Sequence, residues 1–260
     1  MFVHFAVQIT AVSRRSLFKV HSNLIMSSVN TTLLHTLFFR MGVAWVLEIF
    51  DTSTVTIETK LMVAGAEVLG GYTVDSTPYK PSEQGISHFY LLHHSQFPQS
   101  AFSIAHQDNY KARIVSYLFE IEAVSILTSQ PYFPCQSSPR ASHDRGFDLI
   151  LHKLNVGLQA DTAGKFEVAG NELKLQDFRI RVGLATQNTL AKGVIVEVEY
   201  GPSSVITQAM PVLTEFIEHF FPDYVDSKPE ILKKTAPEPY FALETLYQYS
   251  LLFSSMRKRA

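Results

Sequence analysis

The chain has 260 residues, of which 46% are hydrophobic and 18% charged, the composition of a globular protein with one large domain or two small ones. Its formal net charge of −2 argues against a protein that binds nucleic acid directly through a basic surface. The one cysteine, Cys135, excludes an intramolecular disulfide and a cysteine zinc cluster, and no run approaches the roughly 18 apolar residues of a membrane-spanning helix.

Residues 1–40 differ in composition from the rest of the chain. They contain Arg14, Arg15, Lys19 and Arg40, many serines and threonines, and no acidic residue. Such a composition is typical of a transit peptide. Because the segment shares no periodicity with residues 41–260, we favour an extension that is either disordered or an artefact of the gene model.

The next part of the chain predicts a strand, a helix and three more strands. Residues 42–50 are rich in Val, Trp and Ile and predict the first strand. Asp51 or Ser53 is expected to cap a helix that ends at Ala64, before Gly65. The strands expected after the helix are residues 70–79, 86–93 and 100–106.

Residues 107–140 are atypical for the interior of a compact domain. Pro131, Pro134 and Pro139 break the chain, and a connection of this length is uncommon between packed elements. We interpret the segment as an insert in a single domain, residues 41–260. It is either a lineage-specific loop or translated non-coding sequence.

Beyond the insert, the pattern predicts a helix followed by a hairpin. Asp144 is expected to cap the helix, whose apolar residues recur on one face. These residues are Phe147, Ile150, Leu151, Leu154 and Leu158. Strands at 165–168 and 172–185 are expected to meet at Gly170 and Asn171, a strong hairpin signal.

The most regular strand of the chain covers residues 194–200, after a turn at 189–193. Its valines and Tyr200 alternate with Glu197 and Glu199, which predicts one face in the core and a glutamate face in water. The same alternation assigns Arg179 and Arg181 of the preceding strand to the solvent face.

Two helices close the chain. The first covers residues 206–221 and is stopped by Pro222; a polar loop, residues 223–237, follows it, and the second runs from about Pro239 to Lys258. Strands outnumber helices and are joined by short turns, so the sequence predicts an α+β fold with an antiparallel sheet.

The last helix has two apolar stripes, whereas a surface helix needs one. The stripe expected to face inward consists of Leu243, Leu246, Tyr247 and Leu251. The predicted partner-binding stripe consists of Phe241, Tyr249, Leu252 and Met256. An apolar stripe left in water would mark an interface. The alternative is that loop 223–237 or another helix covers it.

Paired glutamates raise one catalytic alternative. Glu197 and Glu199 share a strand face, and Glu120 and Glu122 repeat the spacing, as in tunnel-type triphosphatases that hold a divalent cation on a barrel wall. Lys174 and the two arginines before the strand could then clamp a polyphosphate. The ExExK form of those enzymes is absent, and alternate glutamates are the ordinary polar face of an exposed strand.

Histidines offer a weaker hint of a metal site. His93 and His94 are neighbours and point to opposite faces of a strand, and His88 has no acidic residue or cysteine beside it. We therefore expect no catalytic, metal-binding or cofactor-binding residue.

Four pieces of the sequence, in order, resemble the family of Mediator complex subunit 20. They are Met41-Gly42-Val43, residues 90–98, the VEVEYGP motif at 196–202, and the last helix from Tyr247 to Lys258. The resemblance implies an antiparallel β-barrel with flanking helices and a non-enzymatic, structural role in the head module of this nuclear coactivator. It implies Mediator subunit 18 as partner, subunit 8 nearby, and RNA polymerase II indirectly.

We expect a chain that begins at Met41 to melt at the same temperature as the full chain, because residues 1–40 share no periodicity with the predicted barrel. Thermal melts of the two chains test this expectation. A melting temperature several degrees lower in the shorter chain would mean that the segment packs on the core.

Overall fold

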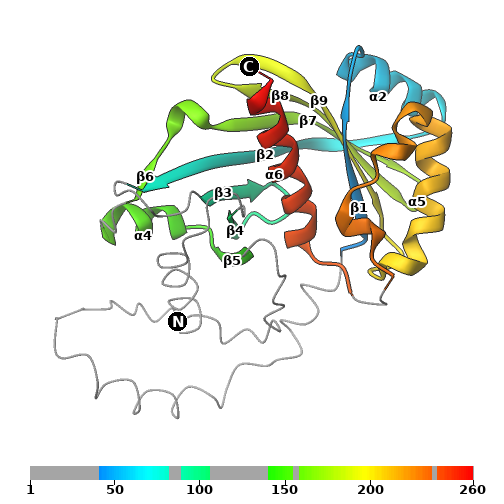
Figure 1. Ribbon diagram of the computed structural model, residues 1–260. Coiled ribbons are helices and arrows are strands. Elements are labelled where there is room, and N and C mark those ends of the chain that lie inside the picture. Colours follow the sequence, from blue (N-terminus) through cyan, green and yellow to red (C-terminus); the bar gives the residue numbers. More distant parts are fainter. Residues whose placement is uncertain (1–40, 82–88, 106–139, 155–157, 236–238, 260) are drawn as a thin grey trace, which may run out of the picture.

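The computed structural model describes residues 41–81, 89–105, 140–154, 158–235 and 239–259 (Figure 1). The predicted N-terminal extension lies outside these ranges, as does the predicted insert except for Arg140.

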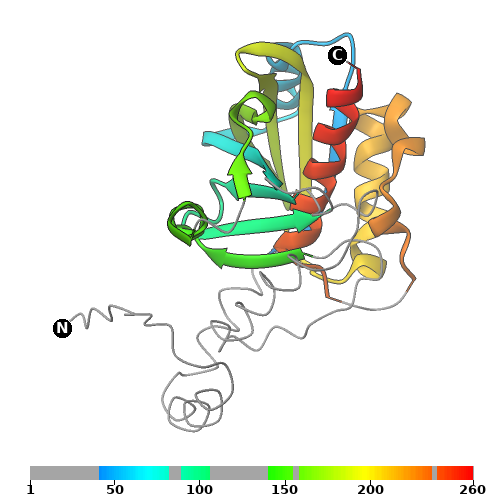
Figure 2. The same ribbon diagram turned by 60° about the vertical axis from the view of Figure 1, so that its left-hand side comes forward.

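In the described part of the chain, nine antiparallel strands form one sheet that curls into a half-barrel (Figures 1 and 2). Its order is β1-β9-β8-β7-β2-β3-β4-β5, and β6 pairs with the end of β2. The strands are β1 (Val43–Ile49), β2 (Glu67–Pro81), β3 (Phe89–His94), β4 (Ser100–Ala105), β5 (Arg140–Asp144), β6 (Leu158–Ala160), β7 (Phe166–Leu175), β8 (Phe178–Gln187) and β9 (Leu190–Tyr200). The predicted α+β class, with a barrel-like antiparallel sheet and flanking helices, is confirmed.

Helices cover both faces of this sheet. The α-helices are α2 (Thr54–Val63), α4 (Phe147–Leu154), α5 (Ile206–Phe220) and α6 (Ala242–Lys258), and the 3₁₀-helices are η2 (Thr162–Gly164), η3 (Pro222–Ser227) and η4 (Glu230–Lys233). Of the two predicted caps for α2, Ser53 is the one used, since its hydroxyl accepts from the Thr56 N–H at 3.2 Å.

The concave face of the half-barrel holds α6. Seven strands contribute buried side chains to one interior cluster with this helix, among them Val46 of β1, Phe166 of β7 and Ile104 of β4. The helix contacts β1 at one end of the sheet and β3, β4 and β5 at the other. It therefore spans the opening that the half-barrel leaves between its first and last strands (Figure 1).

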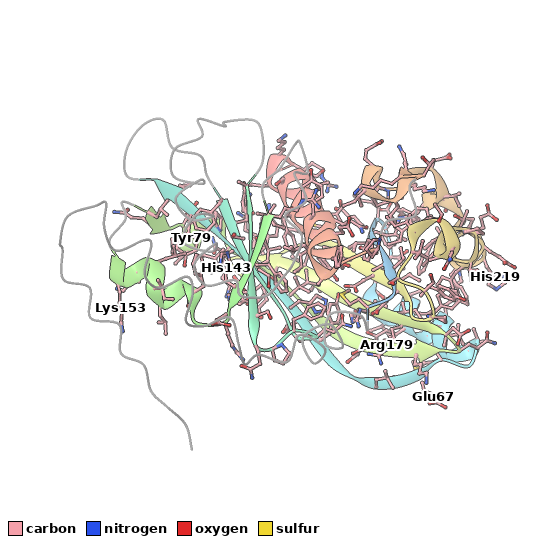
Figure 3. All side chains as sticks on the ribbon, turned by 90° about the horizontal axis from the view of Figure 1, so that it is seen from below. Glu67, Tyr79, His143, Lys153, Arg179 and His219 are labelled. Atoms are coloured by element: carbon pink, nitrogen blue, oxygen red, sulfur yellow. The ribbon has the colours of Figure 1, made fainter. Side chains whose placement is uncertain are left out.

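The convex face is covered at two places. Near β1, β9 and β8, the helices α2 and α5 pack on the sheet through residues such as Leu61 and Ile217. Near β3 and β4, α4 packs through Phe147, and Figure 3 shows Tyr79 and His143 on this side. From Val194 to Glu199, both faces of β9 are thus inside the molecule.

The predicted hairpin at Gly170 and Asn171 is wrong. β7 runs straight through these residues, and the chain turns at Gln176, which adopts a positive φ of 54°. Gly170 is needed for a close approach, because a Cβ there would lie 1.9 Å from the Val182 carbonyl oxygen of β8. A glycine that admits a neighbouring backbone had been interpreted as a turn signal.

Other boundaries also differ from the predictions. The turn before β9 is at Asn188 and Thr189, whose φ angles are 48° and 70°, so β9 begins before the predicted 189–193 turn ends. Asp144 ends β5 instead of capping a helix.

The α4 helix is also shorter than predicted. It ends at Leu154, and Leu158 belongs to β6. Its predicted inner stripe is buried at Phe147 and Leu151, but Ile150 is exposed.

We expect Gly170→Ala to lower the free energy of unfolding by about 3 kcal/mol, because strands β7 and β8 must separate to admit the methyl group. Gly71→Ala is the matched control on the neighbouring strand, where a Cβ would meet its nearest atom at 3.7 Å. Urea unfolding of both variants tests this. Equal stabilities for the two would show that the close approach costs nothing.

Candidate functional site

A group of charged side chains lies on the concave face of β7, β8 and β9, beneath α6. Arg181 stands opposite Glu197 in the strand register, and its Nη1 donates to Glu197 and, at 2.9 Å, to Glu199. Its Nη2 donates to Glu172 of β7 at 3.1 Å. Arg181, Glu197 and Glu199 are at most 2% exposed, so they compensate one another where water cannot.

The second carboxylate oxygen of Glu197 joins the sheet to α6. The Tyr249 hydroxyl donates to it at 2.8 Å, and His94 Nε2 lies 3.2 Å away. His94 Nδ1 accepts the backbone N–H of Gln96 at 3.0 Å, so Nε2 carries the ring proton and donates to Glu197. Both oxygens of this buried carboxylate are therefore engaged.

The electrostatics of this group fix its protonation. Burial alone would raise the pKa of Glu197, but Arg181 and the hydrogen bond from His94 outweigh it and lower that pKa to about 2. Burial would lower the pKa of Arg181, but the surrounding carboxylates raise it. Burial, and then Glu197, raise the pKa of Tyr249. At neutral pH Glu197 is therefore a carboxylate, Arg181 a guanidinium and Tyr249 a neutral phenol.

The prediction that Glu197 and Glu199 face solvent is wrong, and so is the same prediction for Arg181. The alternation along β9 is as expected, but the glutamate face lies under α6 while the valine face lies under the convex helices. Arg179 is the second residue of β8. Its side chain is 52% exposed and lies 3.7 Å from Glu172. Figure 3 shows it towards the periphery.

The same geometry does not favour a tunnel-type triphosphatase. Glu197 and Glu199 already bind Arg181, and α6 fills the face where a tunnel enzyme would hold its substrate. Of the other proposed elements, Lys174 is exposed, and Glu120 and Glu122 lie outside the described residues.

A second set of hydrogen bonds fixes α6 to the free edge of β1. The Gln248 side chain accepts from the Val46 N–H at 2.9 Å and donates to the Ala44 carbonyl oxygen at 2.9 Å, as a neighbouring strand would. The hydroxyl of Tyr240 also donates to the Ala44 oxygen, at 3.1 Å. The pattern of apolar residues did not predict the role of Gln248, although a polar residue three positions before Leu251 in a largely apolar helix could have indicated it.

Two of the four predicted partner-binding residues are core residues. Tyr249 and Met256 are 0% and 1% exposed and belong to the concave cluster, so the prediction that they face a partner is wrong. The sheet itself covers them, and not loop 223–237 or another helix. Leu251, assigned to the inward stripe, is 40% exposed. Of the rest of the predicted inward stripe, Leu246 is buried as expected and Leu243 and Tyr247 pack partly against the concave cluster, so both predicted stripes contribute to the interior.

The other two predicted residues remain partly accessible. Phe241 and Leu252 are half-buried, and Leu252 packs against the concave cluster with the rest of its side chain in water. Leu243 and Tyr247 are also half-buried and pack against the concave cluster, whereas Leu251 is exposed on the outer side of α6. The outer side of α6 thus keeps apolar surface.

The described residues offer little to a metal ion. No group of three or more His, Cys, Asp or Glu among them could hold one. His93 pairs with Asp75 at 3.1 Å on the side opposite His94, as the strand parity predicts, and His88 lies outside the described residues. No helix in the described ranges has the length and apolarity needed to cross a membrane.

We expect Glu197→Gln to lower the free energy of unfolding by about 3–5 kcal/mol at neutral pH, because it leaves Arg181 undercompensated beneath α6. Since folding depresses the pKa of Glu197 from 4.5 to about 2, its ionisation stabilises the fold fully above pH 4.5. This contribution is lost as pH falls towards 2, so the two stabilities should converge there.

Urea unfolding between pH 7 and pH 2.5 measures this convergence. Glu167→Gln is the control, because Glu167 is an exposed glutamate on β7 and should change little at any pH. A gap between the parent chain and Glu197→Gln that stays constant with pH would contradict the assignment of the charge.

A family model and the relatives found by sequence point to one family. The model of the family described as "TATA-binding related factor (TRF) of subunit 20 of Mediator complex" matches residues 41–254. The chain is 40% identical to Mediator of RNA polymerase II transcription subunit 20 of Caenorhabditis briggsae, over 84% of this chain and 100% of that protein. It is 28% identical to the Homo sapiens subunit 20, over 77% of this chain and 84% of that protein.

Among solved structures, that of the Schizosaccharomyces pombe Mediator head module contains a chain that matches 69% of this one, with 12% identity and a TM-score of 0.34. The family model covers most of the described residues, including the charged group and α6 up to Ser254. On the family model and the Caenorhabditis relative, the chain belongs to the Mediator subunit 20 family.

Proposed function

We propose that the chain is a non-enzymatic, structural subunit of the Mediator head module in the nucleus. In this role it supports regulated transcription by RNA polymerase II through contacts between proteins. Its partners are Mediator subunit 18 and, nearby, subunit 8, with the polymerase reached indirectly and no direct contact to nucleic acid. The observation that carries the proposal is the family match over residues 41–254.

The interior of the half-barrel supports a structural role. Both oxygens of Glu197 are engaged by Arg181, His94 and Tyr249, and those of Glu199 by Arg181 and the Gly42 N–H. With α6 also bonded to the β1 edge, this arrangement makes a rigid body and leaves these two glutamates no free oxygen for a substrate or cation. A rigid scaffold suits a subunit whose task is to hold its neighbours in place.

The outer side of α6 is the proposed contact with subunit 18. Phe241 and Leu252 keep part of their apolar surface in water, next to Leu251, and half-buried aromatic and aliphatic side chains are frequent anchors in interfaces. Tyr249 and Met256 support this surface from beneath and do not contribute to it.

We expect the double variant Phe241→Ser and Leu252→Ser to capture at least about tenfold less subunit 18 when the head subunits are co-expressed, because two apolar anchors are lost. Val55→Ser is the control, an exposed apolar residue of α2 on the convex side. Thermal melts verify that each variant folds.

The outcomes separate the two levels of the proposal. Undiminished capture by a folded double variant would place the contact on another surface. Failure of the unmodified chain to capture any head subunit would contradict the structural role itself.

A further inference from the structure

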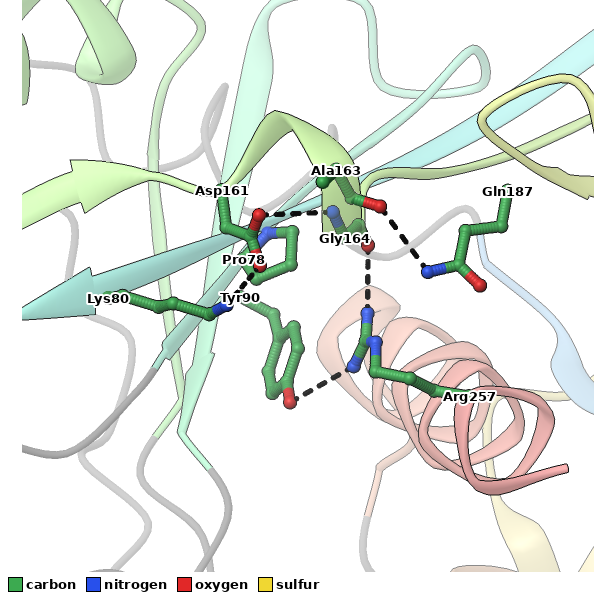
Figure 4. A pocket seen from close by; sticks show the side chains of 8 residues that line it. All are labelled: Pro78, Lys80, Tyr90, Asp161, Ala163, Gly164, Gln187 and Arg257. Atoms are coloured by element: carbon green, nitrogen blue, oxygen red, sulfur yellow. Dashed lines mark hydrogen bonds and ion pairs between the residues drawn. The ribbon is translucent and has the colours of Figure 1, made fainter. Parts of the chain in front are cut away.

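A pocket of about 400 Å³ opens at one end of the half-barrel, beside the last turn of α6 (Figure 4). It lies between β2, β3, η2 and α6, away from the charged group beneath Tyr249. Its polar lining consists of Lys80, Tyr90, Asp161, Gly164, Gln187 and Arg257.

Arg257 reaches the pocket from α6 and has only neutral partners there. Its Nη1 donates to the Tyr90 hydroxyl at 3.2 Å and its Nη2 to the Gly164 carbonyl oxygen at 2.9 Å. Its Nε is buried and has no hydrogen-bond partner among the described residues. The rings of Tyr90 and Phe166 each lie 5.2 Å from the guanidinium carbon. The guanidinium charge is thus held by aromatic rings and dipoles, with no carboxylate ion-paired to it in the described part of the chain.

The one carboxylate among the lining residues is already engaged. Asp161 Oδ2 pairs with Lys80 at 2.5 Å, and its Oδ1 accepts the Gly164 N–H at 3.2 Å. The hydrogen bond from Lys80 lowers the pKa of Asp161, so it stays ionised and committed to that lysine. Two cations and one anion then line the pocket, which leaves one positive charge in excess on a chain of formal charge −2.

We propose that this pocket receives an aspartate or glutamate side chain of a neighbouring protein subunit. The carboxylate would meet Arg257, whose planar guanidinium is suited to paired hydrogen bonds with carboxylates, while Lys80 stands at the rim with 55% of its side chain exposed. Gln187, which donates only weakly to the Ala163 oxygen at 3.4 Å, supplies another amide donor.

The size of the pocket decides the form of the ligand. A volume of about 400 Å³ admits one or two side chains and not a folded element, so the acidic residue must come from an extended segment or a chain end. The assignment of the carboxylate to a protein subunit rests on the proposed function. The positive charge of the pocket, which would bind the carboxylate, is independent of that function.

A peptide titration tests the pocket without any Mediator subunit. The probe is acetyl-Glu-Glu-Glu-amide, with acetyl-Gln-Gln-Gln-amide as its uncharged match and inorganic phosphate as a second anion. Chemical-shift changes in the full-length chain report binding and its site. We expect the glutamate peptide to shift amides around Gly164 and Gln187 and to bind at least about tenfold more tightly than the glutamine peptide.

Variants tie the binding to the two cations. Arg257→Gln and Lys80→Gln should each weaken the glutamate peptide by about tenfold, whereas Lys258→Gln, one residue further along α6 and outside the pocket, should change it less than about twofold. Because Arg257 also fixes α6 to Gly164, melts accompany each variant. Lys80→Gln, at the exposed rim, decides the matter if Arg257→Gln fails to fold.

Three results would overturn the inference. These are equal binding of the two peptides, binding that is insensitive to Lys80→Gln in a folded protein, and tighter binding of phosphate than of the glutamate peptide, which would assign the pocket to phosphorylated ligands. Loss of subunit capture by the unmodified chain, with peptide binding retained, would instead contradict the proposed function alone.

Discussion

Glu197 places a full negative charge in the middle of the concave face, and its surroundings are arranged to keep that charge compensated. Arg181 neutralises it from β8, and hydrogen bonds from His94 and Tyr249 complete its shell from β3 and α6. A buried carboxylate without these partners would cost several kcal/mol. The charge of Glu197 is fully compensated only when Arg181 stands opposite it in the strand register and α6 places Tyr249 beside it. The strand register and the position of α6 therefore depend on each other.

This requirement explains which side of α6 faces the concave sheet. Apolar burial alone would accept either stripe of the helix, because both carry leucine and aromatic side chains. The Tyr249 hydroxyl needs an acceptor when buried, and Glu197 provides it. Gln248 then reaches the β1 edge from the adjoining side of the helix. Polar bonds select the orientation, and apolar packing supplies most of the stabilisation.

The sequence predicted where strands and helices occur better than it predicted which of their faces other elements cover. Alternation identified β9 and which residues share a face, but not that α6 buries the glutamate face, because the compensating Arg181 lies sixteen positions away and meets it only through strand register. Gly170 was mistaken for a turn because a glycine beside asparagine has the same pattern whether it bends the chain or admits a neighbour. Tyr249 and Met256 were wrongly predicted to bind a partner. The helix has two similar apolar stripes, and its sequence alone does not show which residues the sheet covers.

The hydrogen bonds from Gln248 also protect the protein against self-association through its edge strand. β1 is the first strand of the sheet, and the Ala44 carbonyl and Val46 N–H on its outer edge would otherwise offer a template to any extended chain. One side-chain amide occupies that template and satisfies it. If α6 detached from β1, the exposed edge could pair with a strand of another molecule and lead to strand exchange or fibrous aggregation. Gln248 therefore protects the protein against aggregation in addition to stabilising its fold.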